Sequence, residues 1–160
     1  LYLLMKIRLI KEKDNLEVEK LIRDCLIEFG GNKPGCAWED KDLGQFYQVY
    51  QPKNKQYLVV IKDNHVVGGC GIGPLDGIEG ICELQKMYCY SEVRGTGIAQ
   101  ELLNQSLEFA RQYYCQCYLE TFSNMIAANR FYLKNGFQLL DQPLIKGPHY
   151  ACDKWYTKDL

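Results

Sequence analysis

The chain has 160 residues, of which 47% are hydrophobic and 24% are charged, the composition of one ordinary folded domain. Nineteen basic residues against 20 acidic residues give a formal net charge of −1, which does not indicate nucleic acid or an anionic membrane as a partner. The longest uninterrupted apolar stretches span five residues, whereas a helix that crosses a bilayer needs about 20. We therefore expect a single domain, residues 1–160, that binds neither nucleic acid nor a membrane.

The first residues lack the basic segment and the small-residue cleavage site of a secretory signal. We interpret Met5 as a possible native start and residues 1–4 as a possible expression or upstream remnant. The eight cysteines include no CxxC pair, and most of them lie in apolar patterns that are typical of reduced thiols in a core. With two histidines, the chain does not predict a metal site, and we expect a cytoplasmic protein.

The chain begins with a predicted strand and a predicted helix. Residues 6–11 alternate between apolar and polar side chains, as in a strand, and residues 14–29 show the i, i+3, i+4 spacing of an amphipathic helix. Asp14 and Glu17 resemble a capping box at the helix start, and the two glycines at 30–31 are expected to end the helix.

An irregular segment, residues 32–52, follows and is expected to contain a short helix around residues 43–50. Its acidic and aromatic side chains could form a substrate loop or could simply pack on the core. Residues 56–61 and 66–72 have strand composition, and the turn-forming residues 62–65 between them predict a β-hairpin.

The second half of the chain alternates again between strands and helices. The predicted elements are a long strand over residues 80–90, a helix that opens at residues 94–99 and runs to about residue 112, a strand over residues 117–121, a helix over residues 124–135, and terminal strands over residues 137–140 and about 149–158. This alternation without a linker predicts one α/β domain with a mixed sheet.

The most informative segment is the glycine-containing turn between the long strand and the next helix. The first N–H groups of a helix lack partners and lie at the positive end of the helix dipole, so that they can bind an anion. Gly95 and Gly97 place no side chain where a phosphate would approach the backbone. The Lys of a Walker loop and the third glycine of a Rossmann turn are absent here. Taken alone, the pattern is more often only a turn.

The pattern Arg94-x-x-Gly97-x-Ala99 resembles the Gln/Arg-x-x-Gly-x-Gly/Ala signature of the GNAT superfamily of acyl-CoA-dependent N-acyltransferases. Residues 82–88 resemble the central strand of that family, and residues 124–137 resemble its later helix with a Tyr-x-x-x-Gly-Phe ending. The resemblance implies a GNAT-like fold of the α/β (α+β) class, in which helices flank a central and mostly antiparallel sheet.

The resemblance also implies that acetyl-CoA is the cosubstrate, with its pyrophosphate on the turn and its pantetheine arm along the preceding strand. The residues that it places against acetyl-CoA are Met87, Tyr88, Cys89, Arg94, Gly95, Thr96, Gly97, Ile98, Ala99, Asn124 and Asn129. Which of the two asparagines contacts CoA stays open, because the spacing from Asn124 to Tyr132 is one residue longer than the commonest family pattern. Arg94, Arg130 and Lys134 could add positive charge near the nucleotide.

Acetyl transfer to an amine needs a base, because an alkylammonium ion is protonated at neutral pH. A pantetheine arm of roughly 14 Å would reach from the turn back to the middle of the strand, where Glu83 lies. We predict Glu83 as the base, with a structural carboxylate as the alternative role and Glu120 as the alternative base. Tyr132 matches the family's tyrosine that protonates the departing sulfur, although a core-packing role is also open.

These observations predict an N-acetyltransferase that joins acetyl-CoA and a primary amine in a ternary complex, as a monomer or a homodimer. An inactive acyl-CoA-binding sensor or interaction domain is the alternative, and an unrelated phosphate-binding module is a weaker one. His149 and Cys152 suggest a hydrolase dyad, but residues three apart on a strand face opposite sides. The sequence does not identify the acceptor.

Overall fold

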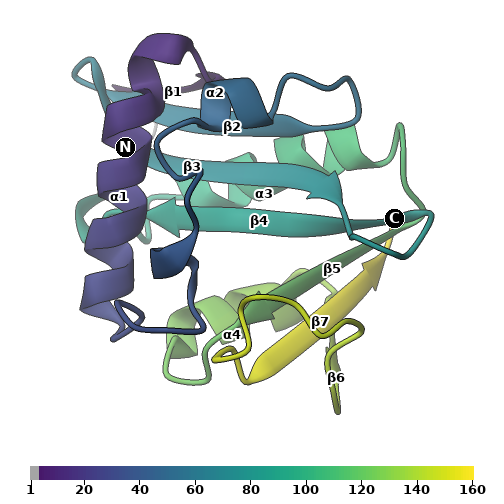
Figure 1. Cartoon of the computed structure of the whole chain (residues 1–160). Coiled ribbons are helices and arrows are strands. Elements are labelled where there is room, and N and C mark those ends of the chain that lie inside the picture. The colour runs from purple at the N-terminus through teal and green to yellow at the C-terminus, as the bar shows by residue number, and fades with distance from the viewer. Residues whose placement is uncertain (1–3) are drawn as a thin grey trace.

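A computed structural model describes residues 4–160 (Figure 1), so that residues 1–3 of the segment interpreted as a remnant lie outside the described part. The elements are β1 (Met5–Leu9), α1 (Asn15–Glu28), α2 (Phe46–Val49), β2 (Gln56–Lys62), β3 (His65–Pro74), β4 (Ile81–Cys89), α3 (Ile98–Ala110), β5 (Gln116–Thr121), α4 (Ile126–Lys134), β6 (Gln138–Leu140) and β7 (Lys154–Asp159). The expected order of strands and helices is thus confirmed.

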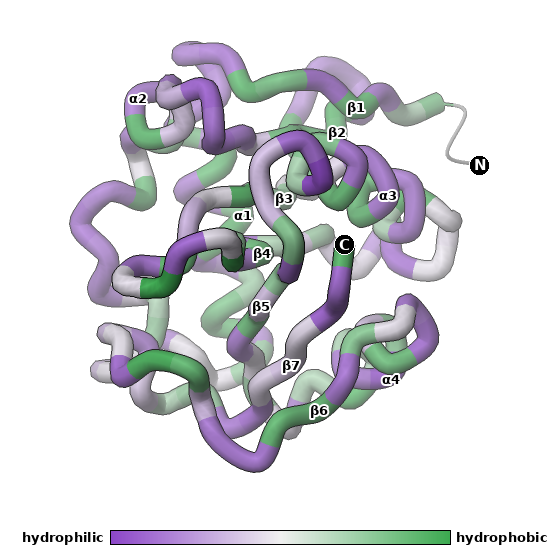
Figure 2. Tube along the Cα trace, turned by 90° about the vertical axis from the view of Figure 1, so that its right-hand side faces the viewer, coloured by the Kyte–Doolittle hydropathy of each residue, from purple (hydrophilic) through white to green (hydrophobic). Residues whose placement is uncertain are grey.

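The strands form one sheet in the order β1-β2-β3-β4-β5-β7-β6, with a hydrophobic core on each face. Helices α1 and α2 lie over one face, and α3 and α4 lie behind the other (Figure 1). Hydrophilic residues are concentrated in the outer loops (Figure 2). All neighbouring strands are antiparallel except β4 and β5. The predicted mixed and mostly antiparallel sheet is therefore confirmed.

The parallel contact between β4 and β5 is short. Three residue pairs join the two strands, and the last of them is Glu83 with Tyr118. Beyond this pair the strands diverge, so that an opening separates the end of β4 from β5 (Figure 1). This opening in the middle of the sheet positions the candidate site.

The start of α1 differs from the predicted capping box. The carboxylate of Asp14 accepts the backbone N–H of Lys11 at 2.7 Å and pairs with Arg8 at 2.6 Å, and it makes no cap bond to α1. Glu17 instead accepts the backbone N–H of Val66 at 2.9 Å, which attaches α1 to β3. The capping interpretation was wrong because both carboxylates find partners outside their own helix.

We expect Asp14→Asn to lower the free energy of unfolding at pH 7 by about 3 kcal/mol, because it leaves the buried Arg8 guanidinium without its partner. Burial disfavours ionised Asp14, but the Arg8 and Lys11 hydrogen bonds outweigh this and lower its pKa. The ion pair therefore contributes fully to the free energy of unfolding above about pH 4. This contribution is lost as the pH falls through the lowered pKa of Asp14 in the folded protein. Urea unfolding at pH 7 and pH 3 measures the difference, which should shrink at pH 3.

The exposed ion pair between Asp24 and Lys20 provides the control for this measurement. Asp24→Asn should cost less than about 1 kcal/mol, as surface ion pairs usually do. Equal losses in the two variants would contradict a special role for the buried pair.

The last strand begins later than predicted. β7 starts at Lys154, and His149 and Cys152 lie in the loop before it. The argument from opposite strand faces therefore does not apply to these two residues.

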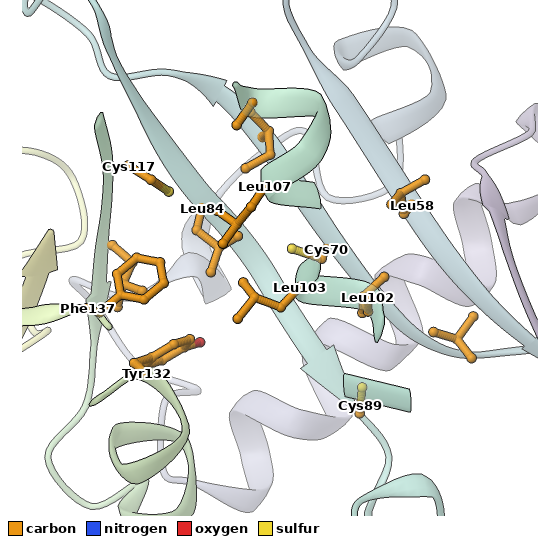
Figure 3. Packing of buried hydrophobic residues seen from close by; sticks show 14 of the residues in the cluster. Leu58, Cys70, Leu84, Cys89, Leu102, Leu103, Leu107, Cys117, Tyr132 and Phe137 are labelled. Carbon is orange, nitrogen blue, oxygen red and sulfur yellow. The ribbon is translucent and has the colours of Figure 1, made fainter. Parts of the chain in front are cut away.

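The cysteines are free thiols and most of them belong to the two cores. Six are buried, Cys152 is partly buried and Cys115 is exposed. Cys70, Cys89 and Cys117 lie among the packed side chains of the core beneath α3 (Figure 3), and burial raises the pKa of the Cys70 thiol to about 12. The expected reduced core cysteines are present. Within residues 4–160, no helix is both long and apolar enough to span a membrane.

Candidate active site

Three neighbouring cavities, which share lining residues, lie beside the end of β4. A cavity of about 240 Å³, called the turn cavity, lies beside Met87–Cys89, Arg94, Gly95 and α4. A cavity of about 530 Å³, called the loop cavity, lies on the other side against residues 40–50 and 145–149. A smaller space of about 70 Å³, the junction, shares Met87, Tyr88, Met125 and Tyr132 with the turn cavity and Glu83, Gln85, Lys86, Glu120 and His149 with the loop cavity.

The turn before α3 has the geometry of an anion site. Gly95 has a φ of 74° and Gly97 a φ of 94°, backbone conformations that favour glycine. Thr96 Oγ1 donates a hydrogen bond to the carbonyl oxygen of Val93 at 2.6 Å and shapes the turn. Within residues 4–160, the N–H groups of Gly95, Gly97 and Ala99 donate to no protein acceptor. These groups can therefore bind a phosphate.

The side chain of Arg94 lines the turn cavity and is also paired within the protein. Its guanidinium pairs with Glu28 of α1 at 2.6 Å, and its Nε donates to the carbonyl oxygen of Cys89 at 2.9 Å. The hydrogen bond from Arg94 lowers the pKa of Glu28 and keeps that carboxylate ionised. Arg94 thus attaches the turn to α1 and β4, and its charge is already balanced inside the protein.

Ile98, Asn124 and Asn129 contribute less to the turn cavity than expected. Ile98 is 1% exposed, so that only its backbone faces the turn. Asn124 donates to the carbonyl oxygen of Phe29 and lines a separate surface hollow. Asn129 donates to two carbonyl oxygens at the start of α4 and accepts the Tyr156 hydroxyl. The other predicted acetyl-CoA contacts lie around the turn cavity or in its turn.

Two carboxylates face the junction from neighbouring strands. Glu83 of β4 accepts a hydrogen bond from Gln85 Nε2 at 3.0 Å, and Glu120 of β5 accepts one from the Tyr118 hydroxyl at 2.8 Å. Burial raises the pKa of Glu120, the Tyr118 hydrogen bond opposes this, and the negative charge of Glu83 raises it further. Either carboxylate can accept a proton from a group in the loop cavity.

Tyr132 lies where the junction meets the turn cavity. The residue is 8% exposed, and its ring packs against Phe137 at a centroid distance of 5.8 Å (Figure 3). It also packs against Tyr156 at 6.0 Å. Burial raises its pKa, so that the hydroxyl keeps its proton. Within residues 4–160 this hydroxyl makes no hydrogen bond to the protein. It is therefore available to donate a proton to a group in the junction.

The structure adds a polar cluster that sequence reasoning missed. Asp40 pairs with Lys86 Nζ at 2.9 Å and with His149 Nε2 at 2.9 Å, and all three side chains are mostly buried. Burial favours protonated Asp40, but the His149 hydrogen bond and the Lys86 charge outweigh it and lower its pKa. The cluster connects two loops that are more than 100 residues apart in sequence, so no local pattern indicated it.

Cys152 lines the junction but is poorly suited to act as a nucleophile. Burial and the negative charge of Glu120 raise the pKa of its thiol to about 12, while the reactive form is the thiolate. His149 Nε2 is bound to Asp40. The hydrolase reading of these two residues has no support in this geometry.

Three comparisons with known proteins agree with this architecture. Residues 17–137 match the family model described as "Acetyltransferase (GNAT) family". The chain is 37% identical over 151 residues to "Uncharacterized N-acetyltransferase YjgM" of Escherichia coli (strain K12), covering 92% of this chain and 90% of the relative.

Solved structures share the fold over nearly their whole length. An acetyltransferase of the GNAT family from Staphylococcus aureus Mu50 has a TM-score of 0.83 at 22% identity, covering 97% of this chain and 98% of that protein. The acetyltransferase yncA from Salmonella typhimurium, solved with its cofactor acetyl-CoA, has a TM-score of 0.74 at 19% identity, covering 98% and 94%.

Proposed function

Because the chain belongs to the acetyltransferase (GNAT) family, we propose that it transfers an acetyl group from acetyl-CoA to a primary amine by direct attack in a ternary complex. The observation that carries this proposal is the junction. It joins an apolar cavity beside an anion-binding turn to a polar cavity, and two carboxylates and a tyrosine hydroxyl line it. The binding of acetyl-CoA by the Salmonella relative supports the choice of cosubstrate.

Acetyl-CoA is proposed to occupy the turn cavity, with its pyrophosphate on the free N–H groups of Gly95, Gly97 and Ala99. Its pantetheine arm would lie along Met87–Cys89, where β4 has diverged from β5 and has no partner on that side. The thioester would then lie in the junction. A turn without a Walker lysine or a third Rossmann glycine favours CoA over ATP or NAD.

The amine is proposed to enter through the loop cavity. The carboxylates that line this cavity outnumber the lysines, and Lys86 is already paired with Asp40. This excess of negative charge favours an acceptor that arrives as an ammonium ion. Glu83 accepts the proton, with Glu120 as the alternative base, and the neutral nitrogen attacks the thioester carbonyl carbon.

A carbon–nitrogen bond then forms and the carbon–sulfur bond breaks, so that the CoA sulfur leaves as a thiolate. Tyr132 is proposed to protonate this thiolate from its hydroxyl. The second proton, which the nitrogen loses as the amide forms, passes through solvent and restores the Tyr132 hydroxyl. An inactive sensor domain would bind acetyl-CoA in the same cavity but release no CoA. The distinguishing experiment is a thiol-release assay with acetyl-CoA and a broad panel of amines. Acetyl-CoA binding without release of CoA for any amine would favour the sensor.

We expect Tyr132→Phe to lower kcat about 10- to 100-fold while the free energy of unfolding changes by less than about 1 kcal/mol. The substitution removes the hydroxyl and keeps the ring packing on Phe137 and Tyr156. The effect is modest because a thiol with a pKa near 8.5 is already a tolerable leaving group. Single-turnover rates with a good acceptor measure it.

Tyr156→Phe is the matched control, because it removes a hydroxyl from the same aromatic cluster. That hydroxyl donates to Asn129 and does not line the junction. The control should retain the wild-type kcat. Full activity of Tyr132→Phe would leave Tyr132 as a packing residue.

A further inference from the structure

We propose that Gln85, held by Tyr50, is a positioning residue that orients the carboxylate of Glu83 toward the amine. The inference rests on the proposed function and concerns two side chains outside the predicted site. Tyr50 donates its hydroxyl to Gln85 Oε1 at 2.7 Å, and Gln85 Nε2 donates to Glu83 Oε1 at 3.0 Å. We call this chain of two hydrogen bonds the relay.

The direction of the relay is fixed by its buried end. Tyr50 is 7% exposed, and burial raises the pKa of its hydroxyl well above the usual value, so that it remains a neutral donor. A donor at this position holds the oxygen of the Gln85 amide and turns the nitrogen toward Glu83. The reversed amide would place its oxygen against the carboxylate, where the two acceptors repel each other.

Alternating glycines of β3 make room for the relay. A Cβ at Gly73 would lie 2.9 Å from Gln85 Oε1, and a Cβ at Gly71 would lie 2.6 Å from the Tyr50 hydroxyl oxygen. Neither glycine has a positive φ, so the backbone conformation does not require glycine at these positions. Glycine at these two positions therefore leaves the space that the side chains of Tyr50 and Gln85 occupy.

The N–H of Gln85 holds one carboxylate oxygen of Glu83 and leaves the second oxygen free for the ammonium group of the acceptor. Tyr57 offers a useful contrast. Its buried hydroxyl donates to the backbone oxygen of Lys86 at 2.8 Å and makes no hydrogen bond to Gln85. Of these two neighbouring buried tyrosines, only Tyr50 is therefore connected to Glu83 through Gln85.

Other charged and titratable groups also surround Glu83. They are Glu120, Tyr118 and Cys117 of β5, Lys86 of β4, Tyr50 beside α2, and Asp40, Lys41, Asp42, Lys55, Asp76, His149 and Cys152 of the loops. Among them, only Tyr50 loses a hydrogen-bond partner when the amide of Gln85 is replaced. A change in the titration of Glu83 in such a variant therefore reports the loss of the relay.

The test replaces Gln85 with Met, which has a similar length and lacks the amide. We expect kcat to fall about 10-fold with little change in KM for acetyl-CoA. The acid limb of the kcat profile should move to higher pH, because the ionised carboxylate loses a hydrogen-bond donor. The carbon-13 titration midpoint of Glu83, assigned with Glu83→Gln, should move in the same direction. This readout does not depend on turnover.

Two further variants probe the relay without removing the amide. Gly73→Ala should displace the amide and shift the titration of Glu83 in the same direction, to a smaller extent. Tyr50→Phe should do likewise, and adding it to Gln85→Met should cause no further shift, because Tyr50 acts through Gln85. Tyr57→Phe is the matched control and should leave the titration of Glu83 unchanged.

An unchanged titration of Glu83 in Gln85→Met would overturn the relay and would leave the proposed function intact. Equal shifts in Tyr57→Phe and Tyr50→Phe would also overturn it. Absence of CoA release with every amine would contradict the proposed function, while the carbon-13 titration would still decide whether the relay exists.

Discussion

Glu83→Gln is expected to lower kcat at pH 7 about 10²–10⁴-fold, the usual contribution of a general base, while the affinity for acetyl-CoA stays nearly unchanged. The substitution preserves the shape of the side chain and removes its ability to take a proton in the junction. An alkylamine with a pKa near 10.4 is almost fully protonated at pH 7. The loss should therefore shrink as the pH rises and free amine becomes abundant. Pre-steady-state rates between pH 6 and pH 10 measure this dependence.

Glu120→Gln is the comparison that separates the two carboxylates. Both side chains line the junction and the loop cavity, and Tyr118 donates to Glu120 as Gln85 donates to Glu83. If Glu83 is the base, Glu120→Gln should reduce kcat much less than Glu83→Gln does. A wild-type rate in Glu83→Gln together with a large loss in Glu120→Gln would transfer the role to Glu120.

Acetyl-CoA and CoA are expected to raise the melting temperature by about 5–10 °C at 100 times Kd, and Gly97→Glu should abolish this shift. The substitution places a carboxylate where the pyrophosphate is proposed to bind, so affinity should fall more than about 100-fold, or about 2.7 kcal/mol. ATP and NAD should give no comparable shift with the wild-type protein. Thermal unfolding with each ligand, followed by calorimetric titration, measures these effects.

Gly77→Glu controls for the strain that a side chain causes at a positive φ. Gly77 has a φ of 82°, similar to the 94° of Gly97, and it lies in the turn between β3 and β4. A Cβ at Gly77 would meet no atom within 4 Å. This variant should lose some stability and keep its response to CoA. Normal CoA binding by Gly97→Glu would place the anion site elsewhere.

Local periodicity and strand composition predicted most of the fold, because α1 and α3 bury one regular face and the central strand β3 is buried almost throughout. The helix after the turn, for example, carries Ile98, Leu102 and Leu103 at spacings that a sheet-covering helix requires, and all three are 1% exposed or less. The start of β7 was predicted about five residues early, because residues 149–153 form a loop in the structure. The predicted capping box of α1 was wrong for a different reason. Asp14 binds Arg8, a tertiary partner that local spacing does not reveal.

The candidate site was predictable where it depends on one contiguous segment, and not where distant segments meet. The turn at Gly95 and Gly97 has the positive φ angles that its glycines suggested. By contrast, the charge of Arg94 is balanced by Glu28, and the side chain of Asn129 is bound within α4 and by β7. Glu28 and Tyr156 lie far in sequence from Arg94 and Asn129, so only the folded chain shows which groups remain free for a ligand.

The cysteines differ in burial, so thiol labelling can measure local and global unfolding of the chain. A disulfide reagent reacts with thiolates that it can reach, so in the native protein Cys115, the exposed thiol, should react first. The thiols of the two cores become reactive only when the structure around them opens. The time course of labelling therefore separates local opening near Cys152 from global unfolding at Cys70 and Cys117. Mass spectrometry of the labelled chain could follow folding without a probe being introduced.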